Sequence, residues 1–287
     1  MRYAKNSVAV QAERDIPLLL QVRNSKFVSH TQLFELMKLG GWEISRDSFN
    51  WRVRRLLRAR FLSVCDGSFG EGTVVYRISR EGIALLEYHG QFTTVMHSKT
   101  EHLPHISQVF HFLELNRIQL ALATQSLLAN WQSEIEVASF NTITGTPYQK
   151  DYDAIVDVWI GDRKARFALE YEHSLKNYRQ YDRIKDALQA EQQVGCILYL
   201  TSGMEVLLHL VQELGAIPRM LAFADATSFK RTLLATKVIT RRNLHGTELR
   251  ELLQWRCLQL SDSHCRFFAF SMPLPSHRYR FFGGVTT

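Results

Sequence analysis

The apolar positions between residues 45 and 79 change from the spacing of a helix to the spacing of two short strands. Ser45 precedes the helical stretch and is expected to cap it, because its hydroxyl can accept a hydrogen bond from a free amide of the first turn. Residues 61–66 and 73–79 each predict a strand, and the glycine-rich stretch 67–72 suits the tip of a hairpin. The predicted helix buries one apolar face, made of Phe49, Val53, Leu56 and Leu57 at helical spacing.

Two further apolar helices are predicted upstream. One begins at Asp15 and continues through residues 16–22, and the other begins at Ser29 and stops at Gly40 and Gly41. Three helices followed by a hairpin is the order of a winged helix-turn-helix, in which the third helix enters the major groove of duplex DNA. Residues 1–92 therefore predict a DNA-binding domain, which a helix over residues 80–88 closes.

The polar face of the third helix carries a high density of positive charge. Six arginines and one acid lie between Arg46 and Arg60, a composition that favours contact with phosphates. The alternative is a helix face that only contacts water. The predicted DNA contacts lie on this helix and on the return strand of the hairpin: Arg46, Ser48, Trp51, Arg52, Arg54, Arg55, Arg58 and Arg77.

A second domain is predicted over residues 103–225, after a polar connector that starts near Gly90. Its pattern alternates between the helical period and short apolar runs, which implies an α/β sheet with helices on both faces, so that the whole chain is α/β (α+β overall). The expected helices are 106–129, 174–193 and 204–214, and the expected strands are 131–140, 153–160, 165–172, 196–200 and 220–223.

Three acids stand at the ends of the predicted strands of this domain. Asp153 opens one strand, while Glu170 and Glu172 lie two residues apart near the end of the next and share one face of the sheet. Such acids are costly together unless water or a metal ion compensates them. Glu134 or Glu136, on the first predicted strand, is a candidate for a further carboxylate of this group.

The layout of these acids resembles the three-layer core of the PD-(D/E)xK nucleases. In that interpretation Asp153 and Glu170 hold Mg²⁺ or Mn²⁺, Glu172 stands where those nucleases have a lysine, and Lys176 replaces the lysine. The predicted catalytic residues are therefore Asp153, Glu170, Glu172 and Lys176. In the alternative interpretation, Glu170 and Glu172 are structural acids paired with one of three cations on the following helix, Arg179, Arg183 or Lys185.

The whole layout resembles the replication-relaxation family of mobile-element proteins over about residues 14–202. The residues that carry the resemblance are Asp153 to Asp157, Phe167 to Ser174, and Lys176 to Tyr181. The resemblance implies DNA binding in plasmid or integrative-element biology, as a transcriptional regulator or a replication or relaxation accessory. We expect a homodimer on duplex DNA that needs no cofactor. A metal-dependent endonuclease is one alternative, and a protein-interaction adaptor is another.

The charge is distributed unevenly along the 287 residues. Residues 1–92 hold 14 Lys and Arg against 9 Asp and Glu, residues 93–225 hold 11 against 16, and residues 226–287 hold 10 against 3. The basic extension 226–287 is expected either to pack on the acidic middle domain or to contact DNA. No apolar run approaches the roughly 20 residues of a membrane helix, so we expect a cytoplasmic protein without a membrane partner.

Overall fold

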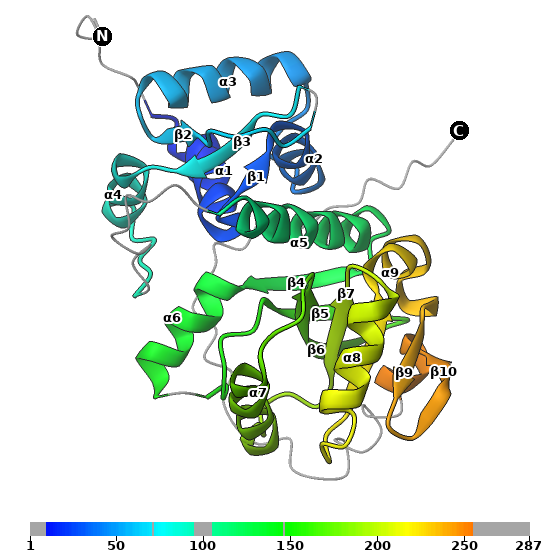
Figure 1. The fold of residues 1–287 in the computed structure, drawn as a ribbon. Coiled ribbons are helices and arrows are strands. Elements are labelled where there is room, and N and C mark those ends of the chain that lie inside the picture. Colours follow the sequence, from blue (N-terminus) through cyan, green and yellow to red (C-terminus); the bar gives the residue numbers. More distant parts are fainter. Residues whose placement is uncertain (1–9, 71, 95–104, 146, 255–287) are drawn as a thin grey trace, which may run out of the picture.

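The computed structural model describes residues 10–70, 72–94, 105–145 and 147–254. These residues form a mixed α/β protein with two sheets (Figure 1). A sheet of three strands in the order β1-β3-β2 belongs to an N-terminal unit, which comprises the described residues up to 94. A sheet of seven strands in the order β10-β9-β8-β7-β6-β5-β4 belongs to a sheet unit, which comprises residues 105–254.

The N-terminal unit contains the predicted elements in the predicted order. Ser29 caps α2 by accepting from the Gln32 amide, and Ser45 caps α3 by accepting from the Ser48 amide. A two-residue strand, β1, was not predicted, because so short a segment leaves no alternation in the sequence. The elements are α1 (Ala12–Ser25), β1 (Val28–Ser29), α2 (His30–Leu39), α3 (Arg46–Arg58), β2 (Leu62–Val64), β3 (Val75–Ile78) and α4 (Arg80–Tyr88).

The sheet unit combines an antiparallel and a parallel part. Strands β4, β5 and β6 are antiparallel neighbours, β6, β7 and β8 are parallel, and β9 and β10 add an antiparallel edge. Its elements are α5 (Ile106–Thr124), β4 (Leu128–Ser133), α6 (Glu134–Thr144), β5 (Ala154–Ile160), β6 (Arg163–Glu172), α7 (Tyr178–Ala190), β7 (Ile197–Thr201), α8 (Met204–Leu214), β8 (Leu221–Asp225), α9 (Ala226–Thr232), the 3₁₀ turn η1 (Leu233–Ala235), β9 (Lys237–Thr240) and β10 (Asn243–Glu248).

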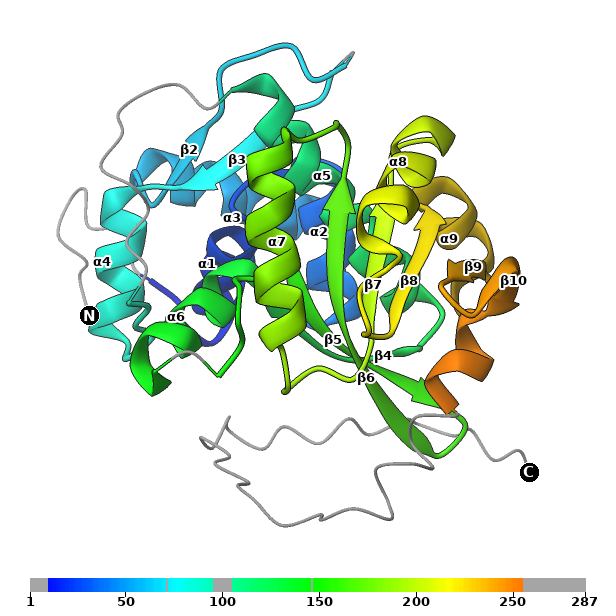
Figure 2. The ribbon, with the colours of Figure 1, turned by 60° about the horizontal axis from the view of Figure 1, so that its bottom comes forward.

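Helices cover both faces of the large sheet, as the sequence predicts (Figure 2). Val156 and Phe167 point to the face that packs against α5 and α9, whereas Ile155 and Ala168 point to the opposite face, against α7 and α8. This alternation follows from the two-residue period of a strand. The three-layer α/β architecture is therefore confirmed.

The predicted strand over residues 131–140 is wrong beyond Ser133, because the chain turns there into α6. Glu136 accepts hydrogen bonds from the Ser133 amide at 2.8 Å and from the Ser133 hydroxyl at 2.7 Å. A serine followed three residues later by a glutamate is a helix start signal. Glu134 and Glu136 therefore lie in the first turn of a helix and not on a strand.

The predicted boundary at residue 225 lies inside the large sheet. Strands β9 and β10 continue the sheet beyond β8, and Leu249 and Leu253 are buried in its core. The first part of the basic extension is thus a structural part of the sheet unit. Residues 255–287 lie outside the described part of the chain.

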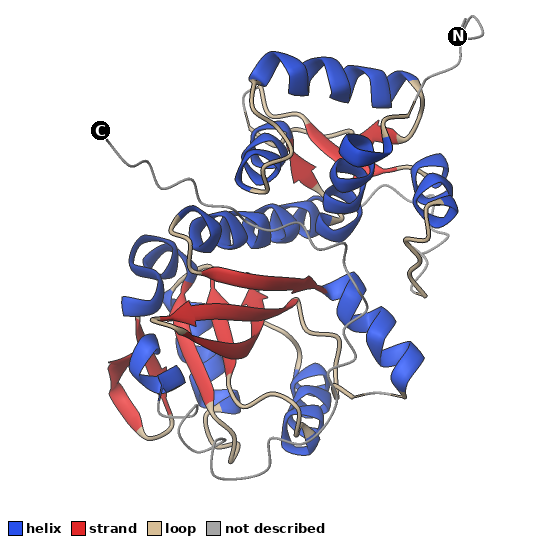
Figure 3. Cartoon of the chain, turned by 180° about the vertical axis from the view of Figure 1, so that it is seen from behind, coloured by secondary structure: helices blue, strands red, loops and turns tan. Residues whose placement is uncertain are grey.

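Helix α5 joins the two units. Figure 1 and, from behind, Figure 3 show it between the N-terminal unit and the large sheet. The Gln32 side chain donates to the Leu113 carbonyl at 2.7 Å, and the Asn116 side chain donates to the Phe27 carbonyl at 2.8 Å. These buried bonds fix α5 against the start of α2.

The helices of the described part of the chain are too short or too polar for any of them to span a membrane.

Candidate nucleic-acid interface and carboxylate cluster

The outward face of α3 presents the residues that the sequence predicts at the surface. Trp51 is 60% exposed, and Arg46, Arg54 and Arg58 are exposed as well. The apolar stripe of the same helix packs inward, with Phe49, Val53 and Leu56 buried among α1 and α2, and Leu57 half-buried. The exposed arginines point outward because the opposite, apolar face of α3 packs in the core.

The predicted DNA contact at Arg52 is wrong, because Arg52 is buried, and the half-buried Arg55 pairs with a buried acid. Arg52 is 2% exposed and donates to Glu43 at 2.5 Å and to Asp15 at 3.4 Å. Arg55 donates to Asp15 at 2.5 Å, and its guanidinium lies 5.1 Å from the centre of the Trp51 ring. Asp15 and Glu43 are buried acids that need these cations.

Three of the other predicted contacts, Arg46, Ser48 and Arg77, have partners within the protein. The Ser48 hydroxyl accepts from Arg14 at 3.1 Å, and the exposed Arg77 donates to Ser63 at 3.2 Å. Arg46 lies over the Phe34 ring, with 4.8 Å between its guanidinium carbon and the ring centre. These contacts orient the side chains without removing them from solvent, except at the half-buried Ser48.

The glycine-rich turn between β2 and β3 packs on the sheet unit. Phe69, in this turn, is 9% exposed, and its ring centre lies 6.1 Å from that of Phe110 on α5. Gly67, Gly70 and Gly72 have positive φ angles, which explains why the sequence needs glycine there. The turn is therefore anchored against α5.

The predicted carboxylates come together near the junction of β5, β6 and β7. Glu170 and Glu172 point to the same face of β6, as predicted from their spacing, and Glu170 lies opposite Tyr199 of β7. Asp153 precedes β5 and accepts from His111 Nε2 at 3.2 Å and from the Tyr171 amide at 2.7 Å. Burial raises the pKa of Asp153, but these bonds outweigh burial and hold it below its usual value.

Glu170 is the most perturbed of these acids. One of its oxygens accepts from Lys150 Nζ at 2.8 Å, whereas the other, Oε1, has no hydrogen-bond partner among the described residues. Burial, together with repulsion from Asp153 and Glu172, raises the pKa of Glu170 to about 7 despite the nearby lysine. Glu170 raises the pKa of Lys150 in turn, which outweighs the effect of burying the ammonium group.

Two lysines pair with the acids of this cluster, and only one of them, Lys176, was predicted. Lys176 lies in the loop before α7 and not on its first turn, and it pairs with Glu172. The alternative prediction, that these acids are paired with cations, named the wrong cations in Arg179, Arg183 and Lys185, because Glu170 pairs with Lys150 and Glu172 pairs with Lys176. Lys150 was missed because it lies in a loop, where no periodicity marks which side chains turn inward.

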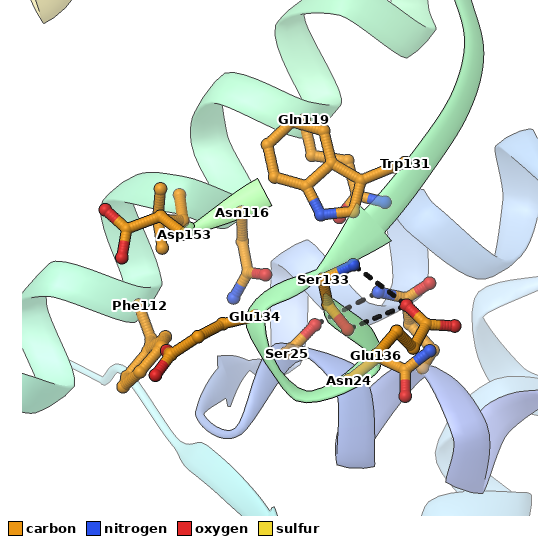
Figure 4. A pocket seen from close by; sticks show the side chains of 12 residues that line it. Asn24, Ser25, Phe112, Asn116, Gln119, Trp131, Ser133, Glu134, Glu136 and Asp153 are labelled. Carbon is orange, nitrogen blue, oxygen red and sulfur yellow. Dashed lines mark hydrogen bonds between the residues drawn. The ribbon is translucent and has the colours of Figure 1, made fainter. Parts of the chain in front are cut away.

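A small cavity of about 60 Å³ lies between Asp153, α1, α5 and the start of α6. Figure 4 shows Asp153 and Glu136 on opposite sides of this cavity, with the Glu136 carboxylate bonded to Ser133. Glu134 pairs with Lys26 at 2.7 Å. The two glutamates of α6 therefore pair with Lys26 and Ser133 and not with Asp153 or Glu170. Within the described ranges, no group of three or more His, Cys, Asp and Glu is placed to hold a metal ion.

Comparison of the chain with protein-family models, with curated proteins and with solved structures finds no match. The resemblance to the replication-relaxation family therefore stays a prediction. Two features of the described residues are candidates for function, the arginine face of α3 and the carboxylate cluster near β5 and β6.

Proposed function

We propose that this chain binds duplex DNA through the outward face of α3. The observation that carries the proposal is the exposure of Arg46, Arg54 and Arg58 on a capped helix whose inner face is locked into a core. Guanidinium groups match phosphate oxygens and the base edges of guanine in the major groove. Only one acid, Asp47, lies within this helix to oppose them.

The elements around α3 support this function. Helices α1 and α2 pack behind it and an antiparallel hairpin follows it, which is the order of a winged helix-turn-helix. The buried cluster of Asp15, Glu43 and Arg52 fixes the inner side of α3, so the outward arginines are held on a rigid support. The resemblance to the replication-relaxation family adds a role as a transcriptional regulator or replication accessory of a mobile element, acting as a homodimer.

The test is the salt dependence of binding to a fluorescent duplex of random sequence. The double variant Arg54→Ala/Arg58→Ala is expected to bind at least tenfold more weakly and to reduce the slope of log K against log salt by about two, since each phosphate contact contributes roughly 0.9. The control variant Arg163→Ala/Arg179→Ala removes two exposed arginines of the sheet unit and is expected to bind like the natural chain. Equal binding by both variants would refute the proposal.

A metal-dependent nuclease is the second candidate, because the carboxylate cluster combines a lysine with a buried carboxylate oxygen that has no partner. Lys150 lies 2.8 Å from Glu170, and the Oε1 atom of Glu170 has no hydrogen-bond partner in the described part of the chain. Mg²⁺ is often held by only one or two carboxylates, together with water and substrate phosphates. In this candidate, Asp153 and Glu170 hold the ion and Lys150, in place of Lys176, is the cation beside it.

Supercoiled plasmid incubated with Mg²⁺ or Mn²⁺ separates the two candidates. The nuclease candidate predicts nicked plasmid with the natural chain and at least a hundredfold slower nicking with Asp153→Asn or Lys150→Met. Lys176→Met is the matched control, because it removes the other paired lysine and leaves the contacts of Glu170 unchanged. Intact plasmid with both metals would rule this candidate out and leave DNA binding by α3 unaffected.

A further inference from the structure

A groove of about 640 Å³ lies between the start of α2, the side of α3, the β2–β3 turn and α5. Arg46, Asn50 and Arg54 enter it from α3 at intervals of four residues, which places them along one line of the helix. Arg117 enters from α5, on the other unit of the molecule. The groove thus begins at the proposed DNA-binding face and continues to the sheet unit.

The lining of the groove is cationic. Three arginines line it, and no Asp or Glu does so among the described residues. Arg117 is 54% exposed and pairs with Glu114 at 2.8 Å, but Glu114 is also bonded to Lys230, so this acid is shared between two cations. The described residues that line the groove therefore neutralise its positive charge only in part, and the groove complements an anionic occupant.

The groove is also held in one shape. Gln32, in its wall, donates to the Leu113 carbonyl of α5, and Phe69 of the turn packs on Phe110 of the same helix. The His30 ring is engaged by the Tyr76 hydroxyl and the Asn50 side chain, both at 2.9 Å. These contacts fix α5, which carries Arg117, relative to the N-terminal unit, which carries Arg46 and Arg54 on α3.

We propose that this groove holds the phosphodiester backbone of the DNA bound by α3, and that Arg117 of α5 is a phosphate contact outside the N-terminal unit. The inference rests on the proposed function and deepens it. The sheet unit then has a direct part in DNA binding, because it supplies one wall of the groove. An exposed arginine on a rigid wall contributes charge to every sequence alike, so its effect is on affinity and salt dependence and not on sequence preference.

The experiment measures binding of the full chain to the same random duplex across a range of salt concentrations. Arg117→Ala is expected to weaken binding about three- to tenfold and to lower the salt slope by about one. Arg117→Lys is expected to bind nearly like the natural chain, since a lysine also contacts phosphate. Urea unfolding of both variants checks that the half-exposed pair with Glu114 is not needed for folding.

The outcomes separate the inference from the proposed function. If Arg54→Ala/Arg58→Ala weakens binding and Arg117→Ala does not, the groove does not hold the backbone and the inference fails alone. If neither weakens binding, the proposed function fails as well. If inorganic pyrophosphate raises the melting temperature of the natural chain but not of Arg117→Ala, while both bind DNA equally, the groove is a site for a small anion and the inference is overturned.

Discussion

Two buried sets of charges in this molecule differ in how completely they are compensated. In the N-terminal unit, both oxygens of Asp15 and both oxygens of Glu43 accept hydrogen bonds, from Arg52, Arg55, Arg14 and the Gln11 amide. In the sheet unit, one oxygen of Glu170 has no hydrogen-bond partner in the described part of the chain. The buried Tyr199 hydroxyl has none there either. The acids of the first set have a hydrogen bond for every buried oxygen, as a purely structural cluster requires, whereas the second set does not.

The difference shows which charged cluster is a candidate for chemistry. A buried cluster whose carboxylate oxygens are all bonded fixes the position of the helices that carry it and has no carboxylate oxygen left for a ligand. An acid that is buried with incomplete bonding has a pKa far from its usual value, as Glu170 has at about 7. Sequence alone makes Arg52 of α3 and Glu170 of β6 look equally functional, and their bonding separates the structural arginine from the incompletely bonded acid.

The largest effect is expected from removing the cation of the compensated cluster. Arg52→Met leaves Asp15 and Glu43 buried with fewer partners, so the free energy of unfolding is expected to fall by about 3–5 kcal/mol. Urea unfolding measures it, and Arg58→Met, which removes an exposed arginine of the same helix, is expected to change stability by less than about 0.5 kcal/mol. A loss below about 1 kcal/mol for Arg52→Met would show that the cluster is not structural.

The next effect comes from the acid of the incomplete cluster. Because the pKa of Glu170 is raised from its usual 4.5 to about 7, the folded state keeps a proton that the unfolded state releases between these values. The contribution of protonated Glu170 to the free energy of unfolding is therefore fully present below pH 4.5. It is lost as the pH rises to about 7, at up to about 1.4 kcal/mol per pH unit.

Denaturant unfolding at a series of pH values checks this sign. Glu170→Gln cannot titrate, so its unfolding free energy is expected to decline less between pH 4.5 and 7 than that of the natural chain. Glu205→Gln, at an exposed position on α8, is expected to keep the natural decline. Parallel curves for the natural chain and Glu170→Gln would mean that Glu170 titrates normally and that the two clusters do not differ.

The smallest effect compares two fully buried tyrosines. Tyr152 donates to the buried Glu191 at 2.9 Å, so Tyr152→Phe is expected to cost about 1–3 kcal/mol by leaving that acid with one bond fewer. Tyr199 has no partner for its hydroxyl among the described residues, so Tyr199→Phe is expected to change stability by less than about 0.5 kcal/mol or to increase it. Thermal unfolding of both variants measures the contrast, which equal losses would contradict.

Much of the fold follows from local patterns. The apolar stripe of α3, the caps at Ser29 and Ser45 and the strands β5 and β6 were predictable, because period and capping depend on residues within one or two turns. The start of α6 was predictable from Ser133 and Glu136, and the error there came from extending a strand pattern past a helix signal.

The sequence by itself determined the order of most of the elements, the presence of helices on both faces of the large sheet and the helix that carries the arginines. Tertiary structure alone decided which arginines stay at the surface, because the acids that pair with the buried Arg52 lie 37 and 9 residues away from it in the sequence. It also brought Lys150, and not Lys176, to Glu170, and it placed Arg117 across from α3. Local spacing describes one element at a time, whereas a charge finds its partner among all the elements that the fold packs together.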